Sequence, residues 1–122
     1  MNKKIAIIDD EQDILNILSK FLSRSEKFDI DVFTNPQSAL NIVKDGDYDL
    51  ILLDIMMPQM SGIEFLTEIK NSSSNAKVIM MTAYSTQDKM IDCEKLGADD
   101  YLTKPFISLR DIENKVLDQL SL

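Results

Sequence analysis

Five short apolar runs alternate along the chain with five amphipathic segments, and this alternation restricts the fold more than any other feature. The runs at 50–53 and 78–81 are continuously apolar, as expected of central parallel strands that helices cover on both faces. The run at 28–33 alternates apolar residues with aspartates, which predicts an edge strand with one face in water. The predicted strands are therefore 4–8, 28–33, 50–53, 78–81 and the short segment 100–103.

The segments between these runs carry the start and stop signals of helices. Asn35 followed by Pro36 is typical of an N-cap and a first helical residue, and Gly46 can end that helix. Ser61 and Glu64 have the spacing of a capping box, which predicts the start of the next helix. Each of these helices would lie between two predicted strands.

Two further serines and two apolar stripes complete the helical pattern. We expect Ser85 to cap a weakly amphipathic helix that ends near Gly97, and Ser108 to cap the last helix. The stripe of the last helix consists of Leu109, Ile112, Val116, Leu117 and Leu120. The stripe of the first helix consists of Ile14, Leu15, Ile17, Leu18, Phe21 and Leu22. Both have helical spacing, which predicts that they pack on the sheet.

Strands that alternate strictly with helices imply right-handed crossovers and a parallel sheet with helices on both faces. For five such units the natural α/β architecture is the flavodoxin-like (βα)5 three-layer sandwich, with strand order 2-1-3-4-5. This order places the half-polar second strand at an edge of the sheet. The 122 residues suffice for one domain and are too few for two, so we expect a single domain over residues 1–122.

The composition excludes several classes of function. A formal net charge of −8, without a dense Lys/Arg cluster, lacks the electrostatic footprint of a nucleic-acid-binding protein. The chain has no histidine, which excludes histidine catalysis and histidine metal sites. No apolar run approaches membrane-spanning length, and no secretory signal is present. The single cysteine, Cys93, fits a reducing compartment and a packing role. We therefore expect a cytoplasmic protein that binds neither nucleic acid nor membrane directly.

Chemically versatile side chains stand at the ends of four predicted strands. They are Asp9, Asp10, Asp54, Thr82 and Lys104. Because ligands of an open parallel sheet bind beyond the carboxyl ends of its strands, these side chains are expected to converge on one edge. Three carboxylates packed together repel one another and stay ionised only around a cation. Hard oxygen donors select Mg²⁺, or a similar ion such as Mn²⁺.

The residue types at this edge indicate phosphoryl transfer. Lys104 supplies a fixed positive charge, and the hydroxyl of Thr82 supplies a hydrogen-bond donor. A metal cation, an ammonium and a hydroxyl around one carboxylate are the groups needed to stabilise a transferring phosphoryl group. Asp54 ends its strand with free space beyond it, so we predict that Asp54 is the nucleophile.

Four sequence blocks resemble those of bacterial two-component response-regulator receiver domains, of the chemotaxis-regulator-like kind. They are residues 7–11, 52–62, 81–83 and 101–106, which read IIDDE, LLDIMMPQMSG, MTA and YLTKPF. Each block alone is weak, but their order and their positions at strand ends make the resemblance specific. It covers essentially the whole chain. The departures are Gln59, where glycine is frequent, and Ser61, where aspartate is frequent, and neither carries the chemistry.

The resemblance implies that Asp54 accepts a phosphoryl group from the phosphohistidine of a sensor histidine kinase, from a phosphotransfer protein, or from acetyl phosphate. Asp10 would bind Mg²⁺ directly and Asp9 largely through water. Asp54 and the backbone carbonyl of Met56 would complete the protein ligands. Met56 and Tyr84 are bulky and uncharged at positions that tune dephosphorylation in that family, which implies a long-lived phosphoaspartate.

The resemblance also implies a switch. Lys104 would pair with the phosphoryl oxygens, and its bond to Pro105 would be cis. Thr82 would move to hydrogen-bond the phosphoryl group, and Tyr101 would turn inward behind it. These changes would alter the surface of the fourth helix, fifth strand and fifth helix, which would signal to an output domain or target protein. Phosphorylation-dependent homodimerisation is compatible with this scheme.

Other functions fit the sequence less well. A phosphate-independent pseudo-receiver, acting by binding or dimerising, would have no need of the five strand-end residues. Haloacid-dehalogenase-like enzymes want a second aspartate two positions after the nucleophile, where this chain has Met56. Flavin binding needs a Ser/Thr/Gly-rich loop after the first strand, where this chain has acidic residues. We therefore expect a signalling domain and not an enzyme. A stand-alone receiver and the first domain of a longer regulator both fit, with stand-alone or phosphorelay use slightly favoured.

Overall fold

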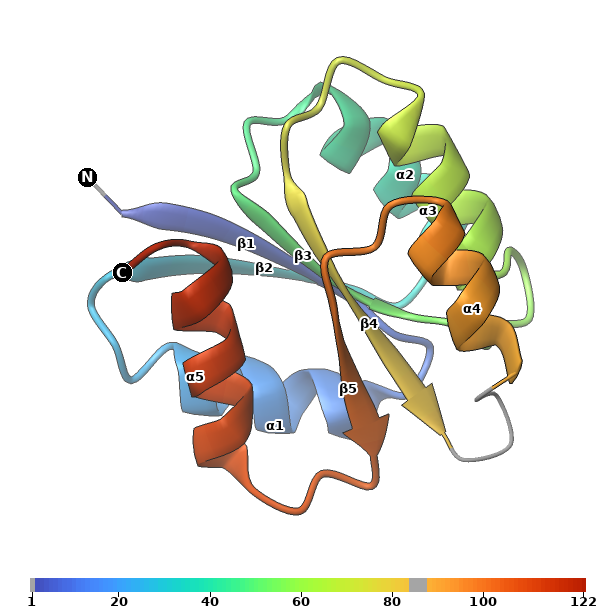
Figure 1. The fold of residues 1–122 in the computed structure, drawn as a ribbon. Helices are drawn as coiled ribbons and strands as arrows, with labels where there is room; N and C mark the ends of the chain where they lie inside the picture. The colour runs from blue at the N-terminus through green and yellow to red at the C-terminus, as the bar shows by residue number, and fades with distance from the viewer. Residues whose placement is uncertain (1, 84–87) are drawn as a thin grey trace.

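The computed structural model describes residues 2–83 and 88–122, which form a five-stranded sheet between two layers of helices (Figure 1). The strands are β1 (Lys3–Ile8), β2 (Phe28–Phe33), β3 (Leu50–Asp54), β4 (Lys77–Ala83) and β5 (Asp100–Lys104). All four strand pairs are parallel, in the order β2-β1-β3-β4-β5. The predicted flavodoxin-like order is confirmed, and β2 lies at the predicted edge with Asp29 and Asp31 exposed.

The helices are α1 (Gln12–Leu22), α2 (Pro36–Asp45), α3 (Gly62–Lys70), α4 (Asp88–Lys95) and α5 (Leu109–Gln119). Helices α1 and α5 cover one face of the sheet, and α2, α3 and α4 cover the other (Figure 1). Successive strand residues point to opposite faces, so Ile7 packs with the first pair of helices and Ile8 with the other three. In the described part of the chain, none of these helices has the length and apolar character needed to span a membrane.

The predicted caps are present wherever the structure describes them. The side chains of Asn35, Ser61 and Ser108 accept hydrogen bonds from backbone N–H groups two or three residues ahead, over distances of 2.9 to 3.3 Å. Each of these bonds satisfies an N–H that has no partner within its helix. Gly46 ends α2 as predicted. The predicted cap Ser85 lies outside the described residues.

Burial follows the sequence pattern with two exceptions, Val32 of β2, which is 41% exposed although it belongs to the apolar positions of the edge strand, and Ile17 of α1. Leu15, Leu18 and Leu22 of α1 are buried against the sheet, and Cys93 of α4 is a buried packing residue as predicted. Ile17, which we assigned to the same apolar stripe, is 48% exposed, so that assignment was wrong. At 3.6 residues per turn Ile17 falls on the flank of the helix, outside the arc that the leucines define.

Gly62 joins α3 to the end of β3 through an unusually close backbone approach. A Cβ atom at this position would lie 2.2 Å from the carbonyl oxygen of Asp54 and 2.8 Å from the Cα of Ile55. The N–H of Gly62 also donates to the carbonyl oxygen of Ile55 over 2.7 Å. Any side chain here would therefore push α3 away from the strand that carries Asp54.

Gly62→Ala is expected to lower the free energy of unfolding by about 1–3 kcal/mol, because rigid backbone and not a flexible side chain would have to move. Urea denaturation of the two proteins measures this difference. Gly97→Ala is a useful comparison, since its neighbours are side-chain atoms of Lys70 no closer than 3.4 Å and its cost is instead the left-handed φ of 98°. An unchanged midpoint for Gly62→Ala would contradict the close packing.

Candidate functional site

Three carboxylates lie together at the carboxyl edge of the sheet. Asp9 and Asp10 directly follow β1, and Asp54 is the last residue of the neighbouring strand β3. One carboxylate oxygen of each lies within 4.8 Å of the others. Asp9 and Asp54 are buried, with exposed fractions of 0% and 5%, whereas Asp10 is exposed. The structure thus brings together the three side chains that the sequence predicted as metal ligands.

Lys104 reaches the same cluster from the end of β5. Its Nζ lies 2.6 Å from Oδ2 of Asp9, 3.4 Å from Oδ1 of Asp54 and 3.6 Å from Oε1 of Glu11. The Lys104 side chain is only 11% exposed, so these ion pairs are largely shielded from water. The bond between Lys104 and Pro105 is cis, as predicted. The ammonium therefore compensates part of the negative charge of the carboxylates.

Burial and mutual repulsion perturb the ionisation of this cluster. Burial raises the pKa of Asp54 to about 7, the charge of Asp9 adds to this rise, and Lys104 opposes it. Burial also raises the pKa of Asp9, against the hydrogen bond from Lys104. Burial disfavours the Lys104 ammonium, but its hydrogen bond to Asp9 and the charges of Asp54 and Asp9 outweigh that effect and raise its pKa. Without a further cation, the carboxylates are therefore not all fully ionised at neutral pH.

Asp54→Asn is expected to stabilise the ion-free protein increasingly as the pH rises. The pKa of Asp54 is about 7 in the folded state and near 3.8 when unfolded, so the folded state holds more protons between these values. The free energy of unfolding of the wild type therefore falls as the pH rises through this window, while the variant lacks that loss. We expect the stability difference to grow by roughly 2 kcal/mol between pH 5 and pH 8. Urea denaturation in EDTA measures it, and parallel pH profiles would contradict it.

Thr82 and Tyr101 occupy adjacent strands but lie differently with respect to the site. Thr82 is buried near the end of β4, and its hydroxyl donates to the carbonyl oxygen of Ala83 over 3.1 Å. Tyr101 packs against the core under α4, and its hydroxyl donates to the carbonyl oxygen of Met90 over 3.3 Å. In this structure the Tyr101 hydroxyl is thus bound to α4, and the predicted inward turn remains a prediction.

Two charged residues near the site were missed or underrated in the sequence. Lys89, in the first turn of α4, places its Nζ 3.3 Å from Sδ of Met56, a half-exposed residue just beyond Asp54. No pattern in the sequence linked these two residues, because Lys89 lies on a helix and not at the end of a strand. Glu11 lies beside Lys104, and its position directly after Asp9 and Asp10 was the available signal. Tyr84, predicted to flank the site, lies outside the described residues.

Comparison with known families identifies the chain. The family model described as the response regulator receiver domain matches residues 5–117. The chain belongs to the response regulator receiver domain family. This match begins within β1, covers β2 to β5 in full and ends within α5, so it includes every strand end that carries a candidate site residue.

The chain is similar to a chemotaxis protein and to two transcriptional regulatory proteins. The receiver domain is 39% identical over 107 residues to the chemotaxis protein CheY of Halobacterium salinarum, which covers 87% of this chain and 88% of that protein. It is 38% identical over 117 residues to the alkaline phosphatase synthesis transcriptional regulatory protein PhoP of Bacillus subtilis. That match covers 95% of this chain but 48% of PhoP, and a match to SrrA of Staphylococcus aureus covers 43% of SrrA. The chain thus spans less than half of these two regulators.

Solved structures agree with the fold. The CheY-like receiver domain of Methanospirillum hungatei superposes with a TM-score of 0.91 at 28% identity, covering 99% of this chain and 95% of that one. The receiver domain of Francisella response regulator 1452 superposes with a TM-score of 0.87 at 30% identity and covers 98% of both chains. The sequence-based resemblance to receiver domains is therefore confirmed.

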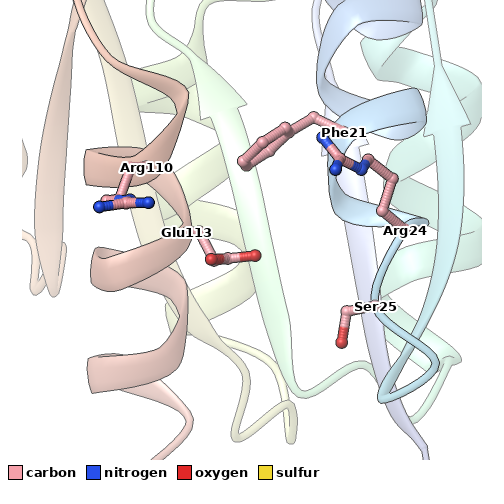
Figure 2. A pocket seen from close by; sticks show the side chains of 5 residues that line it. All are labelled: Phe21, Arg24, Ser25, Arg110 and Glu113. Atoms are coloured by element: carbon pink, nitrogen blue, oxygen red, sulfur yellow. The ribbon is translucent and has the colours of Figure 1, made fainter.

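A second feature of the receiver domain is a shallow hollow between α1 and α5, with a volume of about 400 Å³ (Figure 2). It is lined by Phe21, Arg24, Ser25, Arg110 and Glu113. Helix α1 starts beside the carboxylates and runs back across the sheet, so Arg24 and Ser25, just beyond its end, lie toward the opposite edge. This hollow carries both signs of charge and is separate from the acidic site.

Proposed function

We propose that residues 1–122 act as one phosphoacceptor receiver domain, which takes a phosphoryl group onto Asp54 from a sensor histidine kinase or phosphotransfer protein. The position of Asp54 carries the proposal. Its carboxylate ends a central strand, with the ammonium of Lys104 3.4 Å away and the oxygens of Asp9 and Asp10 grouped with it. This is a nucleophilic oxygen surrounded by the charges that phosphoryl transfer requires.

The site also fits a divalent cation. Three ionised carboxylates and one ammonium would leave a net negative charge, and burial together with the charge of Asp9 raises the pKa of Asp54 to about 7, which a bound cation would lower again. Hard oxygen donors without nitrogen or sulfur suit Mg²⁺, with Mn²⁺ as a substitute. Asp9, Asp10, Asp54 and the backbone carbonyl of Met56 would hold the ion. When bound, it would supply positive charge next to the phosphoryl oxygens.

The transfer follows from the residues around Asp54. A carboxylate oxygen of Asp54 would attack phosphorus while the phosphorus–nitrogen bond of the donor phosphohistidine breaks, and the departing imidazole nitrogen would take a proton. Lys104, already 3.4 Å from Asp54, would pair with a phosphoryl oxygen and offset its charge. The hydroxyl of Thr82 would leave the carbonyl of Ala83 and donate to another phosphoryl oxygen. Burial of the site strengthens each of these electrostatic contacts.

The signal would pass to the surface made by α4, β5 and α5. The hydroxyl of Tyr101 binds the backbone of α4 at Met90, and Lys115 of α5 donates to the carbonyl oxygen of Tyr101. Tyr101 therefore connects all three elements. If Thr82 moved toward a phosphoryl group and Tyr101 turned inward behind it, the bond to α4 would break. A change of contacts at one end of this surface would then alter its affinity for a partner.

The partners follow from the same proposal. The donor is a sensor histidine kinase or phosphotransfer protein in the cytoplasm. The receiver of the signal is an output domain in the same chain, a separate target protein or a second copy of the domain. PhoP and SrrA are named as transcriptional regulators of greater length, which supports an output domain as one arrangement. The net charge of −8 argues against direct binding of nucleic acid by this domain.

The test is the intact mass of the protein after incubation with acetyl phosphate and Mg²⁺. We expect one phosphate adduct that is stable in acid, is lost in base or hydroxylamine as an acyl phosphate should be, and requires the divalent ion. Incubation with EDTA in place of Mg²⁺ is the matched control. If no adduct formed under any of these conditions, the phosphate-independent pseudo-receiver would replace the proposed function.

A further inference from the structure

The ammonium of Lys104 lies closer to Asp9, a proposed metal ligand, than to Asp54, the proposed phosphoacceptor. Its Nζ is 2.6 Å from Asp9 Oδ2 but 3.4 Å from Asp54 Oδ1. The side chain of Asp9 is fully buried, so this ammonium is its main source of compensating charge. In this arrangement Lys104 occupies, electrostatically, the place of a cation bound to Asp9.

A divalent cation bound at the three carboxylates would destabilise this arrangement. A doubly charged ion among the three carboxylates would repel an ammonium held 2.6 Å from one of them. Lys104 is only 11% exposed, so water cannot readily solvate the displaced charge. The ammonium therefore needs another anion within reach of its present position.

Asp54, 3.4 Å from the ammonium, would itself hold the ion, so Glu11 is the remaining anion within reach. Its Oε1 already lies 3.6 Å from Nζ of Lys104, and its side chain is 62% exposed and therefore able to adjust. Its backbone is fixed to the site, because its N–H donates to Asp9 Oδ1 over 2.9 Å. Glu11 stands at the N-cap of α1, but its side chain makes no capping hydrogen bond. Helix capping therefore does not account for this carboxylate.

We propose that Glu11 is a positioning residue that takes over the ammonium of Lys104 when a divalent cation occupies Asp9, Asp10 and Asp54. The inference rests on the proposed function, because it assumes that the three carboxylates hold the ion. Glu11 would release Asp9 for the ion and keep Lys104 at the site, from where it reaches the phosphoryl group. Glu11 would thus contribute to metal affinity only through Lys104.

Calorimetric titration with Mg²⁺ alone, without any phosphodonor, tests this coupling. We expect Glu11→Gln to weaken Mg²⁺ binding about threefold to fivefold, the range of a mostly exposed ion pair. In a Lys104→Gln background the same change should alter the affinity less than 1.5-fold, roughly within error, because no ammonium has to move. Glu11→Asp should restore part of the lost affinity. Asp13→Asn, which removes an exposed carboxylate from the first turn of α1, is the matched control and should leave it unchanged.

The possible outcomes distinguish failure of the inference about Glu11 from failure of the proposed function. Equal weakening by Glu11→Gln in both backgrounds would mean that Glu11 acts as a nearby charge only, and would overturn the inference. Unchanged affinity in Glu11→Gln would overturn it too, while Mg²⁺ binding by the wild type still supported the proposed function. Absence of Mg²⁺ binding by the wild type would instead count against the proposed metal site and remove both.

A second measurement avoids dependence on the Lys104→Gln variant, which loses a buried ion pair and could unfold. The side-chain ammonium of Lys104 can be followed by nitrogen NMR in the wild type and in Glu11→Gln. We expect its protons to stay protected from exchange after Mg²⁺ is added to the wild type, and to lose protection in the variant. Equal protection in the two proteins would contradict the transfer of Lys104 to Glu11.

Discussion

Asp54→Asn is expected to abolish formation of the phosphate adduct with acetyl phosphate and Mg²⁺. The amide oxygen is a much weaker nucleophile than a carboxylate, and an acyl phosphate cannot form on it without loss of the amide nitrogen. The substitution keeps the size of the side chain, and the ion-free protein should be more stable with it, so loss of the adduct would not reflect unfolding. Intact-mass measurement over a time course, beside the wild type, gives the result.

The control for this experiment is an aspartate with the same chemistry in a different place. Asp47 is exposed and precedes β3, at the edge of the sheet opposite the site. Asp47→Asn should be phosphorylated at the wild-type rate. An adduct of undiminished yield on Asp54→Asn would contradict the assignment, and peptide mapping would then show whether Asp9 or Asp10 had accepted the group.

The sheet could be predicted from the sequence because its signals are local and agree with one another. The continuous apolar runs of β3 and β4 require cover on both faces, and only helices from the intervening segments can supply it. The caps at Asn35, Ser61 and Ser108 independently fix where those helices begin. The error at Ile17 arose because a hydrophobic side chain at roughly helical spacing was taken as buried, although the flank of a surface helix tolerates apolar residues.

The meeting of Asp9, Asp54 and Lys104 could also be predicted, since neighbouring parallel strands end at the same edge. Which carboxylate Lys104 contacts most closely could not be predicted from the sequence. Three carboxylates stand within reach, and the choice depends on differences of about an ångström that strand positions do not encode. The bond from Tyr101 to the backbone of α4 is another such detail, because it depends on how a helix of weak amphipathicity settles on the sheet.

Lys104→Met is expected to have two large effects that respond differently to Mg²⁺. It should slow phosphorylation by acetyl phosphate about 100- to 1,000-fold, the usual cost of removing one group that stabilises developing charge. In EDTA it should also lower the free energy of unfolding by about 3 kcal/mol, because Asp9 is left buried without its ammonium 2.6 Å away. The rate follows from intact-mass time courses, and the stability from urea denaturation. Lys20→Met, an exposed lysine on α1, should change neither.

Adding Mg²⁺ distinguishes a role in the chemistry from a role in the fold. The ion can take over the compensation of Asp9, so millimolar Mg²⁺ should restore most of the stability that Lys104→Met loses. It cannot take over the contact that Lys104 makes with a phosphoryl oxygen from the side of β5, so the rate should remain low. Recovery of both stability and rate would mean that Lys104 serves only to keep the carboxylates together, and would contradict its role in phosphoryl transfer. Recovery of the stability without recovery of the rate would assign Lys104 both roles. It would then stabilise the fold through Asp9 and assist phosphoryl transfer at Asp54.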